Sequence, residues 1–366
     1  MMMKKIILSF FLGVIFSGLC QAQNGFHVTG DVQRVPAGKL YLVVERENKV
    51  DTLGMAFIRG ERFEFSGRVD CVEVAQIRMV GRNGGIQFML ENAEIRVKID
   101  ENGVSVEGGE EQALYNRYME FEKVMNEVQA LFQKQGSAEA RQGRQMEMLA
   151  LQQRVEKAMR EADKGIVALM KAEPDCVATA YMLYKSIGRL TPEELQERYG
   201  WLGERARESV CGEVVGDYLA AREQVAEGAI APDFTVATPQ GDSLSLHSVR
   251  AKLKLVSFWA SWNAPGRREN TNLINLFRKF QPVGLQIISI SMDTNDQAWK
   301  RAIGEDGMTW LNGSDLRGEG SPLLSLYFIT ELPHTILLDE ENRIIATGLL
   351  GNDLWKKVNE LLKKKK

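Results

Sequence analysis

The segment FWASWNAPGRREN, Phe258–Asn270, marks a sharp change in the hydrophobic pattern of the chain. It begins within KLKLVSFWA, residues 252–260, an almost continuous apolar run that is typical of a strand buried on both faces. Residues 267–280 follow with the pattern of a helix. The segment therefore predicts a strand that turns directly into a helix, with Trp262 and Pro265 at the turn.

The residues after this turn continue to alternate between strand and helix patterns. LQIISISMD (285–293) predicts a second buried strand, and NDQAWKRAIGEDG (295–307) a second helix. HTILLD and RIIATGLL then predict a hairpin around EEN, and residues 353–364 a terminal helix. A βαβ core followed by a ββα end predicts a central mixed sheet with helices on its faces.

The segments APDFTVATPQGDSLSLHSVRAKLKLVSFWASW and APGRRE resemble a known family. They are similar to the thioredoxin-like domain of exported TlpA-type and AhpC/TSA-type thiol-disulfide oxidoreductases, whose signature is Phe-Trp-Ala-x-Trp-Cys-x-Pro-Cys-Arg-x-Glu. The resemblance covers residues 228–364 and implies a thioredoxin fold over 228–366. Leu332-Pro333 stands where the family has its cis-proline beside the active site, which implies a cis peptide bond here. The matching signature residues are Phe258, Trp259, Ala260, Trp262, Pro265, Arg267 and Glu269.

The chain departs from this signature at the two redox positions. In the family the first cysteine attacks a substrate disulfide and the second resolves the mixed disulfide, but here the positions are Asn263 and Gly266. Neither side chain can form the thiolate that thiol-disulfide exchange requires. The resemblance also places Thr271 where the family has a helix proline. We therefore expect no catalytic residue at the motif, and we expect Asn263 to cap the following helix.

Two further segments precede this domain. Residues 23–108 alternate between apolar and polar positions, with turn signals such as RNGG and ENG, and predict an antiparallel β-domain of seven or eight short strands, a sandwich or barrel. Residues 109–227 predict a helical connector. Together they resemble the amino-terminal domain of unknown function that is often joined to such reductases.

The connector carries two apolar stripes at helical spacing. The first runs from Leu114 to Phe132 and the second from Met148 to Ile166, and each is shorter than a coiled coil requires. An antiparallel pair packed within the chain is therefore favoured over a coiled-coil dimer. Short helices are expected at 177–187, 191–199 and 213–226, the second with Thr191 at its N-cap.

The first 22 residues have the pattern of an export signal. Two lysines precede an apolar run that ends at Leu19, and small residues stand before an expected cleavage after Ala22. Acylation of Cys20 is the alternative, although Leu19 is bulky for such a site; the protein would then contact a membrane. The expected location is the periplasm or another exported compartment.

Cleavage would leave Cys71, Cys176 and Cys211, none of them in a Cys-x-x-Cys pair. They are expected to be buried thiols, with a disulfide between Cys176 and Cys211 as the alternative. The formal charge of −3, without a basic stripe, makes nucleic acid a poor partner. No residue pattern indicates a metal or another cofactor, since His247 and His334 are isolated. Glu269 is expected to be exposed or salt-bridged.

Two functions follow as expectations. The first is a redox-inactive binding module that holds an extended peptide or envelope protein in a groove formed by Trp262, Ala264, Pro265, Leu332 and Pro333. The alternative is an active thiol-disulfide oxidoreductase of the cell envelope that uses the cysteines outside the motif. The oligomeric state and the role of the β-domain are left open by the sequence.

Overall fold

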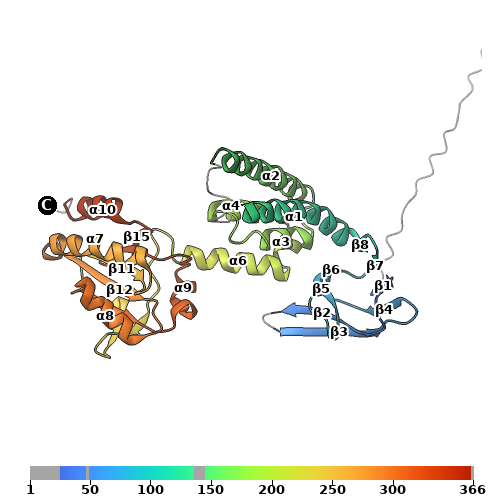
Figure 1. Ribbon diagram of the computed structural model, residues 1–366, viewed down its shortest axis with the longest axis horizontal. Helices are drawn as coiled ribbons and strands as arrows, with labels where there is room; N and C mark the ends of the chain where they lie inside the picture. Colours follow the sequence, from blue (N-terminus) through green and yellow to red (C-terminus); the bar gives the residue numbers. More distant parts are fainter. Residues whose placement is uncertain (1–24, 47–48, 136–144, 364–366) are drawn as a thin grey trace, which may run out of the picture. The chain divides into compact units, whose positions relative to one another are not determined.

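The computed structural model describes residues 25–46, 49–135 and 145–363 (Figure 1). The chain divides into two compact units, residues 1–215 and 216–366, and the division falls inside the helix α6 (Val210–Glu223). The predicted signal segment, residues 1–22, and the expected new terminus at Gln23 lie outside the described residues. Among the described helices, none combines the length and the apolar character needed to cross a bilayer.

The N-terminal part is a β-sandwich. Its eight strands form two four-stranded sheets, ordered β4-β1-β7-β8 and β3-β2-β5-β6, whose inward side chains share one core. Val28, Leu42 and Phe88 are fully buried there. The strands are β1 (Phe26–Val32), β2 (Lys39–Arg46), β3 (Lys49–Phe57), β4 (Arg62–Gly67), β5 (Glu73–Met79), β6 (Ile86–Leu90), β7 (Glu94–Asp100) and β8 (Gly103–Glu107).

The predicted antiparallel β-domain is confirmed, with one parallel strand pair that the sequence did not predict. β1 and β7 are parallel, whereas the other neighbouring pairs of the sandwich are antiparallel. The chain crosses to the second sheet between these two strands. A long crossover of this kind lets β7 return in the same direction as β1.

The helical segment begins with α1 (Glu110–Gln135) and α2 (Gln145–Ala172), which pack against each other (Figure 1). Both predicted apolar stripes have buried members, among them Leu114, Tyr118 and Ile166. Three short helices follow before α6: α3 (Val177–Tyr184), α4 (Pro192–Trp201) and α5 (Glu204–Arg207). Of these, sequence patterns did not predict the four-residue α5.

Thr191 caps α4, as the sequence predicts. Its hydroxyl accepts a hydrogen bond from Glu194 N at 3.2 Å, and the Glu194 carboxylate accepts one from Thr191 N at 2.9 Å. This reciprocal pair is a capping box, which satisfies two main-chain donors at the start of the helix.

The C-terminal unit is built on a seven-stranded mixed sheet, ordered β10-β9-β13-β12-β11-β14-β15. β11 (Leu253–Trp259) lies between its parallel neighbour β12 (Leu285–Ser291) and its antiparallel neighbour β14 (His334–Asp339). Every residue of β11 is buried, as the apolar run predicts. The other strands are β9 (Thr235–Ala237), β10 (Ser243–Ser245), β13 (Leu311–Ser314) and β15 (Ile344–Thr347).

Helices cover both faces of this sheet. Side chains of α7 (Ala264–Phe280), α8 (Asp296–Asp306) and α10 (Gly351–Lys363) share a core with one face, and α9 (Pro322–Leu326) packs on the other. Three short 3₁₀ helices connect the elements: η2 (Leu246–Ser248), η3 (Gln281–Val283) and η4 (Gly318–Gly320). The predicted mixed sheet is confirmed; the short strands β9, β10 and β13 are additional to the prediction.

Candidate functional site

The turn between β11 and α7 is held by a helix cap. Asn263 precedes α7 in an extended conformation, and its side-chain oxygen accepts a hydrogen bond from Gly266 N at 2.7 Å. Pro265 stands in the first turn, where a missing N–H removes no helical hydrogen bond. The predicted role of Asn263 as N-cap is confirmed.

Gly266 lies close against this cap and is buried. A Cβ atom added to it would lie 3.0 Å from Asn263 Oδ1 and 3.4 Å from the Trp259 Cβ. The Asn263 amide thus occupies the space beside Gly266 into which a larger side chain would extend. The two positions that the signature gives to cysteine are therefore in contact and filled by a hydrogen-bonded amide.

The turn is also held by hydrogen bonds to the buried carboxylate of Asp293. Asp293 is 2% exposed, and its carboxylate accepts hydrogen bonds from Ser261 N at 2.9 Å and Ser261 Oγ at 2.6 Å. Ser291 Oγ donates to the same carboxylate at 2.6 Å. Sequence reasoning missed Asp293, although an acidic residue two positions after the buried run LQIISIS was a signal that could have found it.

Arg267 connects α7 to α8. Its guanidinium donates to both oxygens of Asp306, at 2.6 and 2.7 Å, and to Glu305 at 3.0 Å. Paired hydrogen bonds of this kind fix the orientation of both groups. Asn270 donates to the same Asp306 carboxylate at 2.9 Å.

The Leu332-Pro333 peptide bond is cis, which confirms the prediction from the resemblance. The loop enters β14 at His334, which pairs with Phe258 at the end of β11, so it lies next to the strand that leads into the turn. Leu332 and Pro333 are half-buried. No main-chain hydrogen bond links Leu332 to another described residue.

The predicted groove residues are only partly brought together. Pro265 and Pro333 line one shallow depression, together with Arg268, Thr271 and Leu350. Trp262 is 60% exposed and Ala264 is also exposed, but neither lines this depression, nor does Leu332.

Glu269 corrects the expectation of an exposed or salt-bridged side chain. It is 7% exposed, and its carboxylate accepts hydrogen bonds from Gly351 N at 2.9 Å and Asn272 Nδ2 at 2.8 Å. It therefore satisfies a main-chain donor at the start of α10. The spacing of residues could not reveal this contact, because α10 lies far away in the sequence.

His334 is a half-buried titratable group beside the cis-proline loop. Burial lowers its pKa, and the nearby carboxylate of Glu331 partly opposes that shift. His247 Nε2 donates a hydrogen bond to Ala231 O at 2.8 Å. Within the described ranges, His, Cys, Asp and Glu side chains form no group of three or more that could hold a metal ion.

The cysteines differ from the expectation of three buried thiols. Cys71 is exposed, and its sulfur lies 3.6 Å from a Glu73 carboxylate oxygen. Cys176 is buried and Cys211 half-buried, and no disulfide joins them in the structure. Burial raises the pKa of Cys176 to about 11 and that of Cys211 to about 12.

Two family models match the chain. Residues 26–115 match a domain of unknown function (DUF4369), and residues 228–347 match the AhpC/TSA family. Among curated proteins, the thiol-disulfide oxidoreductase ResA of a Bacillus cereus strain is 26% identical over 147 residues, which are 40% of this chain and 83% of that protein. ResA of Bacillus subtilis is 23% identical over 147 residues, with 40% and 80% covered.

Two solved structures are also similar to the C-terminal part of the chain. The thioredoxin domain of a thiol-disulfide oxidoreductase from Bacteroides vulgatus is 33% identical and covers 37% of this chain and 98% of its own, with a TM-score of 0.36. A thiol-disulfide oxidoreductase from Bacteroides fragilis is 32% identical, with 36% and 98% covered and a TM-score of 0.34.

The fold and the site together define a class of protein. A mixed sheet, a capped helix directly after the buried strand β11 and a cis-proline loop beside that turn define a thioredoxin-like domain. The family model over residues 228–347 and the similarity to ResA show that the chain belongs to the AhpC/TSA family of thioredoxin-like thiol-disulfide oxidoreductases.

Proposed function

We propose that this chain is a redox-inactive member of its family that binds an extended segment of another polypeptide in the cell envelope. The observation that carries the proposal is the cap at the motif. Asn263 holds Gly266 N at 2.7 Å, so the positions of the two redox cysteines form a stable helix start without sulfur.

The chemistry of disulfide exchange needs a thiolate nucleophile. From Ala231 to the end of the chain the sequence contains no cysteine. An amide such as that of Asn263 is neither an acid-base group nor a good nucleophile near neutral pH. The C-terminal unit therefore has no side chain that could attack a disulfide.

The cysteines of the other unit are poor substitutes. With a pKa of about 11 for Cys176 and about 12 for Cys211, the thiolate form of either is rare near neutral pH. Cys71 is exposed, and its thiol donates toward a Glu73 carboxylate oxygen at 3.6 Å. This chemistry argues against the alternative of an active oxidoreductase that uses cysteines outside the motif.

The surface around the motif suits a peptide. Trp262 is exposed, Pro265 and Pro333 line one depression, and Leu332 has no main-chain partner among the described residues. An extended segment could pair with the main chain of Leu332 and cover these apolar side chains, as in strand addition. The proposed groove is thus Trp262, Ala264, Pro265, Leu332 and Pro333.

The location in the cell envelope rests on the amino-terminal pattern. Lys4 and Lys5 before an apolar run, with Ala22 at the expected cleavage site, support export. We expect an intact mass of the secreted protein that begins at Gln23. A mass that retains Met1, or that carries acyl groups on Cys20, would contradict this expectation.

A turnover assay tests the loss of redox activity. The full chain is incubated with insulin and dithiothreitol, and disulfide reduction is followed over time. We expect the rate of dithiothreitol alone. A rate well above that background would contradict redox inactivity, and Cys71→Ser, Cys176→Ser and Cys211→Ser variants would then identify the thiol responsible.

A further inference from the structure

The strand β3 leaves one edge of the N-terminal sandwich without a neighbour. It stands first in its sheet, and its residues 49–57 pair with β2 alone, whereas just beyond its end Arg59 forms a bridge to Arg62 of β4 with hydrogen bonds of 2.9 and 3.1 Å. Ile58 N donates to Gly38 O at 3.0 Å, so the main-chain groups of Ile58 point toward β2. Those of Ala56, two residues earlier and opposite Leu40, point the same way. Because successive residues of a strand direct their main-chain groups to opposite sides, those of Met55 and Phe57 point to the open edge.

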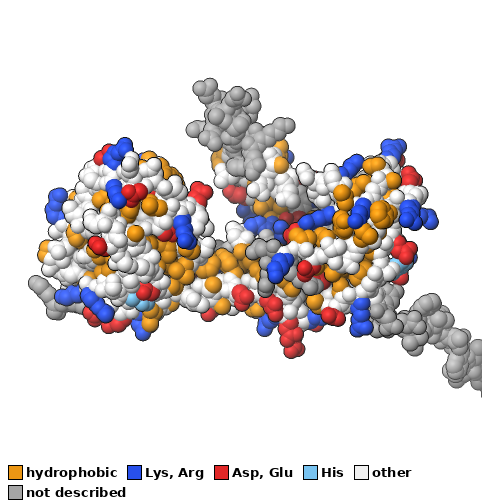
Figure 2. Space-filling model, turned by 90° about the horizontal axis from the view of Figure 1, so that it is seen from below, with side chains coloured by type: hydrophobic (Ala, Val, Ile, Leu, Met, Phe, Trp, Pro, Cys, Tyr) orange, Lys and Arg blue, Asp and Glu red, His pale blue; other side chains and the backbone are white. Residues whose placement is uncertain are grey.

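This edge is apolar and exposed. Val50, Met55 and Phe57 are 50%, 53% and 49% exposed. Figure 2 shows hydrophobic side chains at the surface of the N-terminal unit, with Lys and Arg side chains around them. Proteins usually protect an edge strand with lysine, proline or a bulge. β3 has no lysine or proline after its first residue. Its one register shift lies opposite Leu42 and Val43, so it does not protect the segment 55–57.

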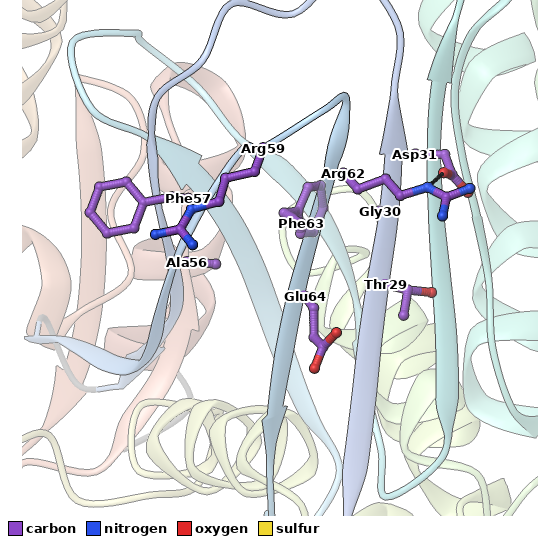
Figure 3. Close-up of a pocket in the computed structure, with 9 residues that line it drawn as sticks. All are labelled: Thr29, Gly30, Asp31, Ala56, Phe57, Arg59, Arg62, Phe63 and Glu64. Carbon is purple, nitrogen blue, oxygen red and sulfur yellow. Dashed lines mark hydrogen bonds and ion pairs between the residues drawn. The ribbon is translucent and has the colours of Figure 1, made fainter.

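A depression lies at the end of β3 and extends to β1 and β4 (Figure 3). Most of its lining side chains are polar or charged, and among its apolar lining residues Ala56 and Phe63 are buried whereas Phe57 is exposed. Gly30 lies beneath the Phe63 ring, where an added Cβ would be only 2.0 Å from a ring carbon. The Phe63 ring therefore packs directly on the Gly30 backbone.

The charge around Phe57 is positive. Lys39 is its cross-strand partner on β2, and Arg59 follows it by two residues. In Figure 3 the Arg59 guanidinium lies beside Phe57, whereas Arg62 extends the other way and pairs with Asp31 at 3.0 Å. Lys39 and Arg59 form no ion pair with the described carboxylates. The Lys39 ammonium lies over the Tyr41 ring, 4.8 Å from its centroid, and both cations can meet carboxylates of a partner.

We propose that the edge of β3 binds an extended acidic segment of a partner polypeptide by strand addition. The main chain of the segment pairs with Met55 and Phe57, its carboxylates meet Lys39 and Arg59, and an apolar side chain enters the depression over Phe63. Strand addition takes its affinity from main-chain hydrogen bonds and its specificity from alternate side chains. The proposal is independent of the groove in the C-terminal unit.

The test uses the full chain and two synthetic peptides with blocked ends. One alternates Val and Glu over about six residues, a typical strand length, and the other alternates Val and Lys over the same length. Binding is measured by calorimetry, and hydrogen exchange of the Met55 and Phe57 amides by mass spectrometry. We expect saturable binding of the acidic peptide alone, with slower exchange at both amides because each gains a hydrogen-bond partner.

Two arginines of the same hairpin provide a matched pair of variants. Arg59→Gln should weaken binding of the acidic peptide about two- to fivefold, the range expected for an exposed ion pair. Arg62→Gln should leave the affinity unchanged, because its guanidinium already pairs with Asp31. Circular dichroism of both variants checks that the sandwich remains folded.

Three results would overturn the proposal. Binding of the acidic peptide without slower exchange at Met55 and Phe57 would exclude strand addition. Equal affinity for the acidic and basic peptides would exclude recognition by charge. A dimer in sedimentation equilibrium without peptide, abolished by Phe57→Asp, would mean that a second copy of the chain occupies the edge.

Discussion

Asn263 contributes to stability at the residue scale, because it satisfies a main-chain donor that a helix start leaves open. Replacing an N-cap Asn by Ala typically costs about 1 kcal/mol. We expect Asn263→Ala to lower the free energy of unfolding of the C-terminal unit by about this amount, measured by hydrogen exchange in α7. Asn295, which caps α8 through Ala298 N at 2.9 Å, is the matched control.

The comparison of the two caps separates stability from binding. Asn295→Ala should be destabilising to a similar degree but should leave peptide binding unchanged, because Asn295 lies outside the proposed groove. If both alanine variants changed peptide binding equally, the effect of Asn263 would be one of stability alone.

His334 predicts how stability depends on pH. Burial lowers the pKa of His334 in the folded protein below the value of about 6.5 that it has in the unfolded chain. At a pH between these two pKa values the unfolded chain therefore binds more protons than the folded protein. We expect the C-terminal unit to lose stability as the pH falls below about 6.5. Denaturant unfolding of the parent and His334→Gln between neutral and mildly acidic pH checks this. An identical pH dependence in both proteins would contradict the assignment.

At the scale of elements, long periodic segments were predictable and short or tertiary features were not. β11 and α7 follow from the apolar run and the cap at Asn263. β9 and β13 are three and four residues long, too short for a period to be recognised. The buried roles of Glu269 and Asp293 depend on contacts with distant segments, which no local pattern contains.

The geometry of the turn between β11 and α7 lets us predict whether cysteines placed at both redox positions would be active. In Asn263→Cys with Gly266→Cys, the amide that crowds position 266 is gone, and the remaining neighbour, the Trp259 Cβ, lies at an ordinary 3.4 Å from the added Cβ. The helix start favours a thiolate at position 263. We therefore expect measurable insulin reduction by the double variant and none by the parent.

The single variants give the control for this experiment. Gly266→Cys alone places its Cβ 3.0 Å from Asn263 Oδ1, so we expect it to be less stable than the double variant and inactive. A double variant that forms its internal disulfide yet reduces nothing would mean that the groove is no longer a thioredoxin-like substrate site.

At the scale of the whole molecule, the second unit begins within α6, before the family match at residue 228. Tyr218 packs edge-on against Phe328 with ring centroids 5.2 Å apart, and the Arg222 guanidinium lies 5.0 Å from the centre of the same ring. We expect a fragment 216–366 to exceed a fragment 228–366 in stability by about 1 kcal/mol, the scale of such contacts. Thermal unfolding measures the difference. Equal stability of the two fragments would place the boundary of the domain after α6.

Binding of polypeptide without redox chemistry is the function that we propose for this molecule. The most direct measurement is a binding titration of the full chain with an unfolded protein whose cysteines are all carboxymethylated, so that no disulfide can form. We predict saturable binding that Trp262→Ala weakens and Val283→Ala does not. Val283 is a suitable control because it is 49% exposed and precedes β12, at the opposite end of the sheet from the motif. Absence of binding, or equal binding by both variants, would contradict the account.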